Sequence, residues 1–67
     1  MGDSVRQGLR DTQAARVLGL HVQTLRNMRS RRVGPAYVKM GRAVRYFEED
    51  LLKYLDERRV KPEQMHA

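Results

Sequence analysis

A turn of only three residues, 19–21, separates two segments that both have the periodicity of an amphipathic helix. Residues 11–18 place small and aliphatic side chains on one face. Residues 22–32 place aliphatic side chains on one face and amide and guanidinium groups on the other. Gly19 suits the left-handed conformation at a helix C-terminus. Short connections that contain glycine are typical of a helix-turn-helix.

The sequence after residue 32 predicts a β-hairpin and a third helix. Gly34-Pro35 must end the second helix, because the residue before a proline is pushed out of helical conformations. Residues 36–40 and 43–47 are rich in Val, Tyr and Phe and are separated by Gly41-Arg42, which predicts a β-hairpin. Residues 48–59 begin with acidic and end with basic side chains, in agreement with a helix macrodipole. The apolar stripe expected to face the core consists of Phe47, Leu51, Tyr54 and Leu55.

These elements predict one small domain, because 67 residues are too few for a second one. We predict a winged helix-turn-helix in the order α-α-β-β-α, mainly α with a small β-hairpin, over residues 9–59. Residues 1–8 and 60–67 are expected to be flexible ends.

The composition argues against several functional classes. The chain has no cysteine, and its two histidines stand far apart without partners at metal spacing, so we expect no metal site and no cofactor. It has no nucleophile–base pairing and no phosphate loop, so we predict that it is not an enzyme. No apolar run approaches the length of a membrane span, and the N-terminus lacks the apolar region of a secretion signal. We therefore expect a soluble, intracellular protein.

Charge is distributed unevenly along the chain. Fourteen Lys and Arg against eight Asp and Glu give a net charge of +6, and no acidic residue occurs between Asp11 and Glu48. Basicity alone is shared by ribosomal proteins, membrane-surface peptides and partners of acidic proteins. The separation of the two signs favours a middle region that binds a polyanion. The basic residues of this acid-free stretch are Arg16, Arg26, Arg29, Arg31, Arg32, Lys39, Arg42 and Arg45.

A set of residues spread over positions 9–55 matches a known pattern. They are Leu9, Ala14-Ala15, Leu18-Gly19-Leu20, Thr24-Leu25, Gly34-Pro35, Lys39, Gly41, Val44-Arg45-Tyr46, Asp50-Leu51 and Tyr54-Leu55. The pattern resembles the small MerR-like winged helix-turn-helix family, which includes AlpA-type regulators and the excisionases of phages and integrative elements, also called recombination directionality factors. Two positions depart from it: His21 stands where a small polar N-cap, usually serine, is expected, and Met28 stands near a common aromatic position.

The predicted second helix exposes side chains that can read base edges in the major groove, where Arg pairs with guanine and Gln or Asn with adenine. Arg29 leans toward the buried side of this helix and is left out of the predicted contacts. One of the arginines at its C-terminal end is alternatively a cap for free carbonyls. The contacts predicted for this helix are Gln23, Thr24, Arg26, Asn27, Ser30, Arg31 and Arg32.

The predicted hairpin, or wing, carries Lys39, Arg42 and Arg45. We predict that these residues reach phosphates or the adjacent minor groove, where arginine is attracted by the enhanced negative potential. Arg42 at the tip is the best placed. For Arg45, the alternative is a pair with a carboxylate of the last helix.

The resemblance implies an excisionase in the cytoplasm of a bacterial cell. Such a protein binds repeated sites in double-stranded DNA, bends the DNA, associates cooperatively with its own copies and assists a site-specific integrase. A MerR-type activator would need a dimerisation helix and an effector domain, for which the dozen residues after Leu55 are expected to be too few. The alternative is a small AlpA-type transcription regulator. A less favoured alternative is an RNA-binding or protein-interaction module that uses the same basic face. The aromatic residues are more simply explained as core than as a stacking platform for single strands.

Overall fold

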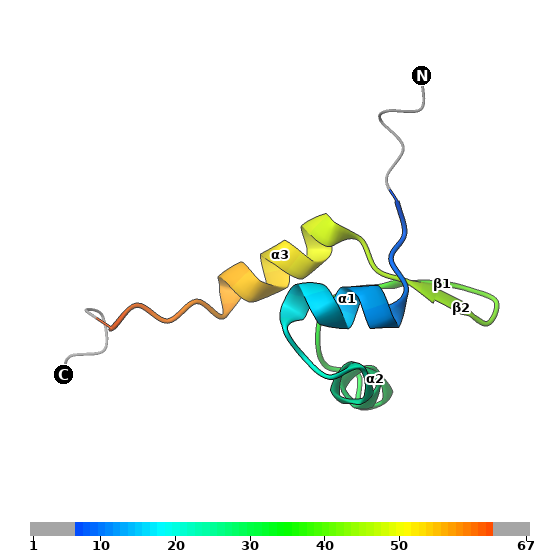
Figure 1. Ribbon diagram of the computed structural model, residues 1–67, viewed down its shortest axis with the longest axis horizontal. Coiled ribbons are helices and arrows are strands. Elements are labelled where there is room, and N and C mark those ends of the chain that lie inside the picture. Colours follow the sequence, from blue (N-terminus) through cyan, green and yellow to red (C-terminus); the bar gives the residue numbers. More distant parts are fainter. Residues whose placement is uncertain (1–6, 63–67) are drawn as a thin grey trace, which may run out of the picture.

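The structure is a computed structural model that describes residues 7–62. It confirms the predicted order of elements, with three helices and a two-stranded antiparallel sheet (Figure 1). No helix in the described range has the length and apolar character needed to cross a membrane. Most of the two ends predicted to be flexible, residues 1–6 and 63–67, lies outside the described residues. The elements are α1 (Asp11–Leu18), α2 (Val22–Ser30), β1 (Val38–Met40), β2 (Ala43–Arg45) and α3 (Glu48–Glu57).

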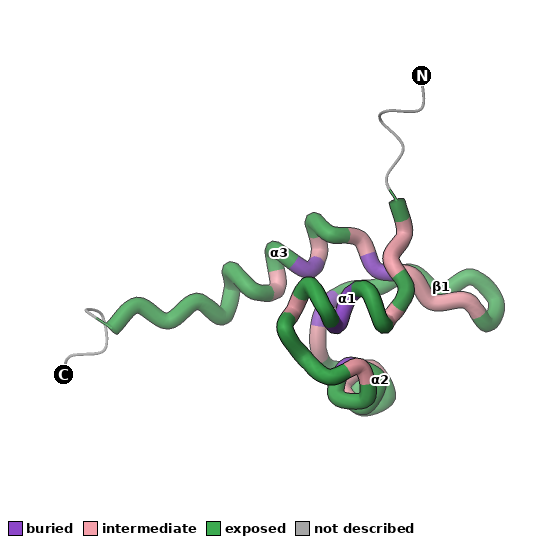
Figure 2. Tube along the Cα trace, in the orientation of Figure 1, coloured by how far each residue is buried: buried purple, intermediate pink, exposed green. Residues whose placement is uncertain are grey.

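The helices and the end of the hairpin share one small core (Figure 2). α1 lies against both α2 and α3, and its two alanines allow close approach because they carry only a methyl group. Half-buried aliphatic side chains from the segment before α1, from α1 and α2 and from β2 pack around this centre. The buried hydrophobic residues of this core are Ala14, Ala15, Leu25, Tyr46 and Leu51.

One backbone pairing was not predicted from the sequence. The amide of Leu9 donates to the carbonyl oxygen of Tyr46 at 2.7 Å, and the amide of Tyr46 donates to the carbonyl oxygen of Leu9 at 2.8 Å. The residue before it, Gly8, lies so close to the hairpin that an added Cβ would stand 3.0 Å from the Cβ of Arg45. The segment before α1 is therefore fixed against the end of the hairpin.

The three-residue turn between α1 and α2 is confirmed. Gly19 adopts a left-handed conformation with a φ of 71°, as a helix C-terminus of this type requires. His21 is the N-cap of α2, and its Nδ1 accepts a hydrogen bond from the backbone amide of Gln23 at 3.3 Å. His21 thus caps the helix at the position where a serine was expected, with a ring nitrogen as the acceptor.

The second helix is shorter than predicted: it ends at Ser30, not at residue 32. The amide of Arg32 donates to the carbonyl of Arg29 at 3.0 Å, and that of Val33 donates to the carbonyl of Met28 at 2.9 Å. These bonds form a Schellman motif, whose left-handed position is usually a glycine. Here it is Arg32, with a φ of 61°.

Three further expectations about the elements were wrong in detail. The strands are limited to β1 and β2, because Tyr46 pairs with Leu9 instead of continuing the hairpin. α3 ends at Glu57 instead of residue 59, and the Nη1 of Arg58 donates to the carbonyl of Tyr54 at 3.4 Å. Leu55 was expected in the core but is 40% exposed, because α3 extends beyond α1 toward its C-terminal end (Figure 1).

The left-handed backbone at Arg32 leads to a prediction about stability. A side chain in this conformation costs about 1–2 kcal/mol, so Arg32→Gly should raise the free energy of unfolding. The gain should be up to about 1 kcal/mol, because glycine also loses more entropy on folding than arginine does. Urea denaturation followed by circular dichroism measures the change. Arg31→Gly is the matched control, because Arg31 has a φ of −90° and gains nothing from glycine. Equal destabilisation by both variants would contradict the argument.

Candidate nucleic-acid interface

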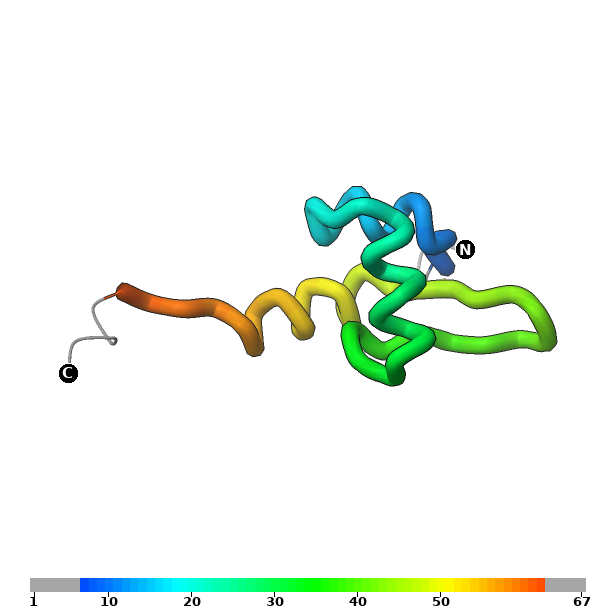
Figure 3. The backbone as a smooth tube through the Cα atoms, turned by 90° about the horizontal axis from the view of Figure 1, so that it is seen from below, coloured from blue at the N-terminus to red at the C-terminus, as the bar shows by residue number. Residues whose placement is uncertain are grey.

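The predicted contact residues lie on two neighbouring elements. Figure 3 shows α2 lying across the molecule beside the base of the hairpin, whose turn extends away from the helices. Arg31 and Arg32, predicted on the helix, lie in the turn that follows it. Arg42 is in the hairpin turn and exposed, and Arg45 on β2 is half-buried. The remaining predicted residues are all exposed, and they are Gln23, Thr24, Arg26, Asn27 and Ser30 on α2 and Lys39 on β1.

The two amide side chains on the exposed face of α2 are bonded to each other. The Nε2 of Gln23 donates to the Oδ1 of Asn27 at 3.0 Å, across one helical turn. Each residue keeps one further group, the Oε1 of Gln23 and the Nδ2 of Asn27, that can pair with a base edge. The bond therefore orients the two side chains and leaves an acceptor and a donor exposed together.

Arg26 is held by a carboxylate that sequence reasoning did not include in the site. Its Nε donates to the Oδ2 of Asp11 at 2.8 Å, and the two side chains are 44% and 22% exposed. The pair uses Nε, so both Nη nitrogens of Arg26 remain for another acceptor. The available signal was that Asp11 is the last acidic residue before the basic stretch and falls in the first turn of a helix.

Arg29 connects the same carboxylate to the hairpin. Its Nη2 lies 4.0 Å from the Oδ2 of Asp11, and its Nη1 donates to the hydroxyl of Tyr46 at 3.0 Å. The guanidinium also lies 5.9 Å from the ring centre of Tyr37, whose ring is 5.8 Å from that of Tyr46. The prediction that Arg29 leans inward is confirmed, and its contacts join α1, α2 and the wing.

These contacts change the acidity of Asp11. The hydrogen bond from Arg26 lowers the pKa of the Asp11 carboxyl below its ordinary value. Partial burial acts in the opposite direction, and the positive charges of Arg26 and Arg29 lower the pKa further. The carboxylate is therefore ionised at neutral pH and serves as a fixed counterion for α2.

The wing presents its cations differently from α2. Lys39 is opposite Val44 in the ladder, and Arg45 is opposite Val38, so the two cations occupy opposite faces of the hairpin. For Arg45 the expected alternative was a carboxylate of the last helix. In the structure its Nη1 donates to the carbonyl of Val44 at 2.8 Å. Arg42 lies beside Gly41 in the turn that joins β1 and β2.

The sequence comparison agrees with this geometry. A family model described as a helix-turn-helix domain matches residues 9–59, which is more than half of the chain. Searches of the curated proteins and of the solved structures give no significant match.

The lowered pKa of Asp11 predicts a pH-dependent effect of its removal. The pair stabilises the folded state above the unfolded-state pKa of about 4, and this contribution is lost as pH falls through the lower folded-state pKa. Asp11→Asn should therefore reduce the melting temperature at neutral pH and lose this effect in strong acid, below the lowered pKa of the Asp11 carboxyl. Thermal melts at both pH values measure the difference. Glu57→Gln, which removes an exposed carboxylate 3.9 Å from Arg58, is the control. A deficit of Asp11→Asn that is equal at both pH values would refute this account of the pair.

Proposed function

Because the chain belongs to this family of small, excisionase- and AlpA-like helix-turn-helix proteins, we propose that it is an excisionase. Family membership indicates a DNA-binding domain rather than a catalytic one. In the proposed role the protein binds repeated sites in double-stranded DNA, bends the DNA and helps a site-specific integrase to excise a phage or integrative element.

One observation supports DNA as the partner above the others: the exposed face of α2 and the wing carry cations and amides, with no acid between Thr12 and Phe47. An α-helix with its side chains is about 10–12 Å across, close to the width of the major groove. In the proposed complex α2 lies in that groove, with Gln23, Arg26 and Asn27 toward the bases. Ser30, Thr24 and the cations of the turn, Arg31 and Arg32, contact phosphates.

The wing accounts for a second part of the proposed complex. With α2 in the major groove, the hairpin turn would reach the adjacent minor groove, and Arg42 is the side chain at its tip. Arginine is attracted to a narrow minor groove by its enhanced negative potential, so Arg42 would contribute mainly its charge there.

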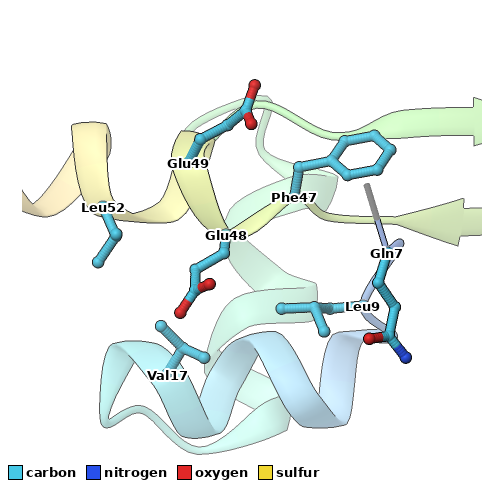
Figure 4. Close-up of a pocket in the computed structure, with 7 residues that line it drawn as sticks. All are labelled: Gln7, Leu9, Val17, Phe47, Glu48, Glu49 and Leu52. Atoms are coloured by element: carbon cyan, nitrogen blue, oxygen red, sulfur yellow. The ribbon is translucent and has the colours of Figure 1, made fainter. Parts of the chain in front are cut away.

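A single copy of so small a domain makes a modest contact with DNA, of the order of 600–1,000 Å² for comparable modules. On repeated sites, copies that contact one another would bind cooperatively, so that several modest contacts give a stable complex. Away from α2, an open groove between α1 and α3 is lined by Leu9, Val17 and Leu52, with Glu48 and Glu49 at its edge (Figure 4). Leu52 is 51% exposed. We propose this groove as the contact with a neighbouring copy of the chain, whose net charge of +6 complements the acidic edge of the groove.

Two arginines should differ in their effect on DNA binding. Arg26→Ala should reduce discrimination between the target and a non-specific duplex, roughly tenfold, because arginine reads guanine bidentately. Arg42→Ala should weaken binding to all sequences alike and lower the slope of log K against log salt concentration by about one. Gel-shift titrations at several salt concentrations measure both quantities.

Double-stranded RNA of the same sequence is the control for this experiment. The narrow major groove of A-form RNA excludes a helix, so the wild-type protein should bind the RNA much more weakly than the DNA. Equal affinity for the two duplexes would overturn the major-groove proposal and favour an RNA-binding module.

Footprinting on the DNA around the protein's own gene tests the excisionase role. We expect protection of direct repeats beside an attachment site, with cooperative binding to those repeats. Protection confined to a promoter would favour an AlpA-type regulator. On those repeats, the double variant Glu48→Lys/Glu49→Lys should reduce cooperativity, while Glu57→Lys, farther along α3, should not. Unchanged cooperativity in the double variant would exclude the groove as the contact.

A further inference from the structure

The hollow at the junction of α1, α2 and the wing has an unusual lining. Its wall consists of Arg10 and Asp11 at the start of α1, Arg29 of α2 and residues 42–45 of the hairpin. Four of these side chains are thus arginines, and the single acid is Asp11. Arg10 was not among the predicted contact residues, because it precedes the acid-free stretch that drew attention to the others.

The charges in this hollow are not balanced. The Asp11 carboxylate is already engaged by Arg26 at 2.8 Å and lies 4.0 Å from Arg29. Within residues 7–62, no carboxylate forms an ion pair with Arg10 or Arg42. Like charges held near one another are unfavourable unless an opposite charge joins them. The hollow therefore has a surplus of positive charge and suits a further anion.

The position of the hollow indicates which anion this is. A helix in the major groove and a wing in the adjacent minor groove lie on either side of one strand of the DNA backbone. The hollow is lined by residues from both elements, Arg29 of α2 and residues 42–45 of the wing. In the proposed complex the DNA backbone between the major and minor grooves passes across this hollow.

We propose that this hollow binds a phosphate group of the DNA backbone and that Arg10 is one of its ligands. The inference rests on the proposed DNA binding and adds a site to it. Arg29 already donates to Tyr46 through Nη1 and has its charge partly balanced by Asp11 at 4.0 Å, and Arg45 donates to a backbone carbonyl. Arg10 and Arg42, which form no ion pair within residues 7–62, are therefore assigned as the main donors. The planar guanidinium fork matches the geometry of phosphate oxygens. Asp11 acts as a positioning residue that keeps Arg29 in the wall.

The salt dependence of duplex binding tests this site with three variants, two at the N-cap residue Arg10 and one at Arg16 within α1. Arg10→Ala should lower the slope of log K against log salt concentration by about one and weaken binding to specific and non-specific duplexes alike. Arg16→Ala removes an exposed arginine that does not line the hollow, and it should leave the slope unchanged. Arg10→Lys, which keeps the charge, should restore most of the slope. The helix start survives in Arg10→Ala, because its contacts with Gln13 and Ala14 use the backbone of residue 10.

Titration with inorganic phosphate, followed by amide chemical shifts, gives a second measurement without DNA. Shifts centred on residues 10–12 and 42–45 of the wild-type protein, lost in Arg10→Ala, are expected. The proposed phosphate site would be contradicted if Arg10→Ala, like Arg16→Ala, kept the wild-type slope. It would also be contradicted if the shifts caused by phosphate spread evenly over the basic surface. Either result would leave the proposed DNA binding intact. Failure of the wild-type protein to prefer duplex DNA would instead count against the proposed function.

Discussion

The contacts of Tyr46 determine how the wing is oriented relative to α2. The side chain is 1% exposed, its backbone pairs with Leu9 in both directions, and its hydroxyl accepts from Arg29. One residue therefore connects the segment before α1, the helix α2 and the hairpin. If this connection were lost, α2 and the wing would no longer have a fixed spacing, and a fixed spacing is what two adjacent grooves of DNA require. A core of so few buried side chains has little else with which to hold the hairpin.

Two features of the surface proposed to contact DNA lower the stability of the free protein. Arg32 occupies a left-handed position that glycine would fill at lower cost, and four arginines line one hollow with a single carboxylate. Neither feature helps the free protein to fold. A bound polyanion would supply the missing negative charge in the hollow and an anion for the Arg32 side chain, although the backbone strain at Arg32 would remain. Local departures of this kind are expected at functional sites, where binding selects the residue against the preference of the fold.

The sequence was sufficient for the fold because its signals are local. The three-residue turn and the acid-rich start of α3 act on neighbouring residues and lie at element boundaries in the structure, and Gly34-Pro35 lies in the loop between α2 and β1. The end of α2 was misplaced because the residue that terminates it, Arg32, gives no glycine signal. Leu55 was misplaced because helical periodicity cannot show how far a neighbouring helix extends.

The candidate site was less predictable, because its organisation depends on residues far apart in the chain. The contact of Asp11 with Arg26 spans 15 positions, and that of Arg29 with Tyr46 spans 17. A pattern within one helix shows which side chains face outward, as it did for Gln23 and Asn27, but it cannot show what holds them. Arg10 and Asp11 enter the site only through the tertiary arrangement of α1 beside the wing.

The central claim is that α2 and the wing together form the surface that meets duplex DNA. Amide chemical shifts of the labelled protein, followed during titration with a short DNA duplex, test it most directly. The account predicts that the largest changes fall on residues 22–32 and 38–45, with little change at Val17 and Leu52 in the groove between α1 and α3. Large changes at that groove, with α2 and the wing unaffected, would contradict it.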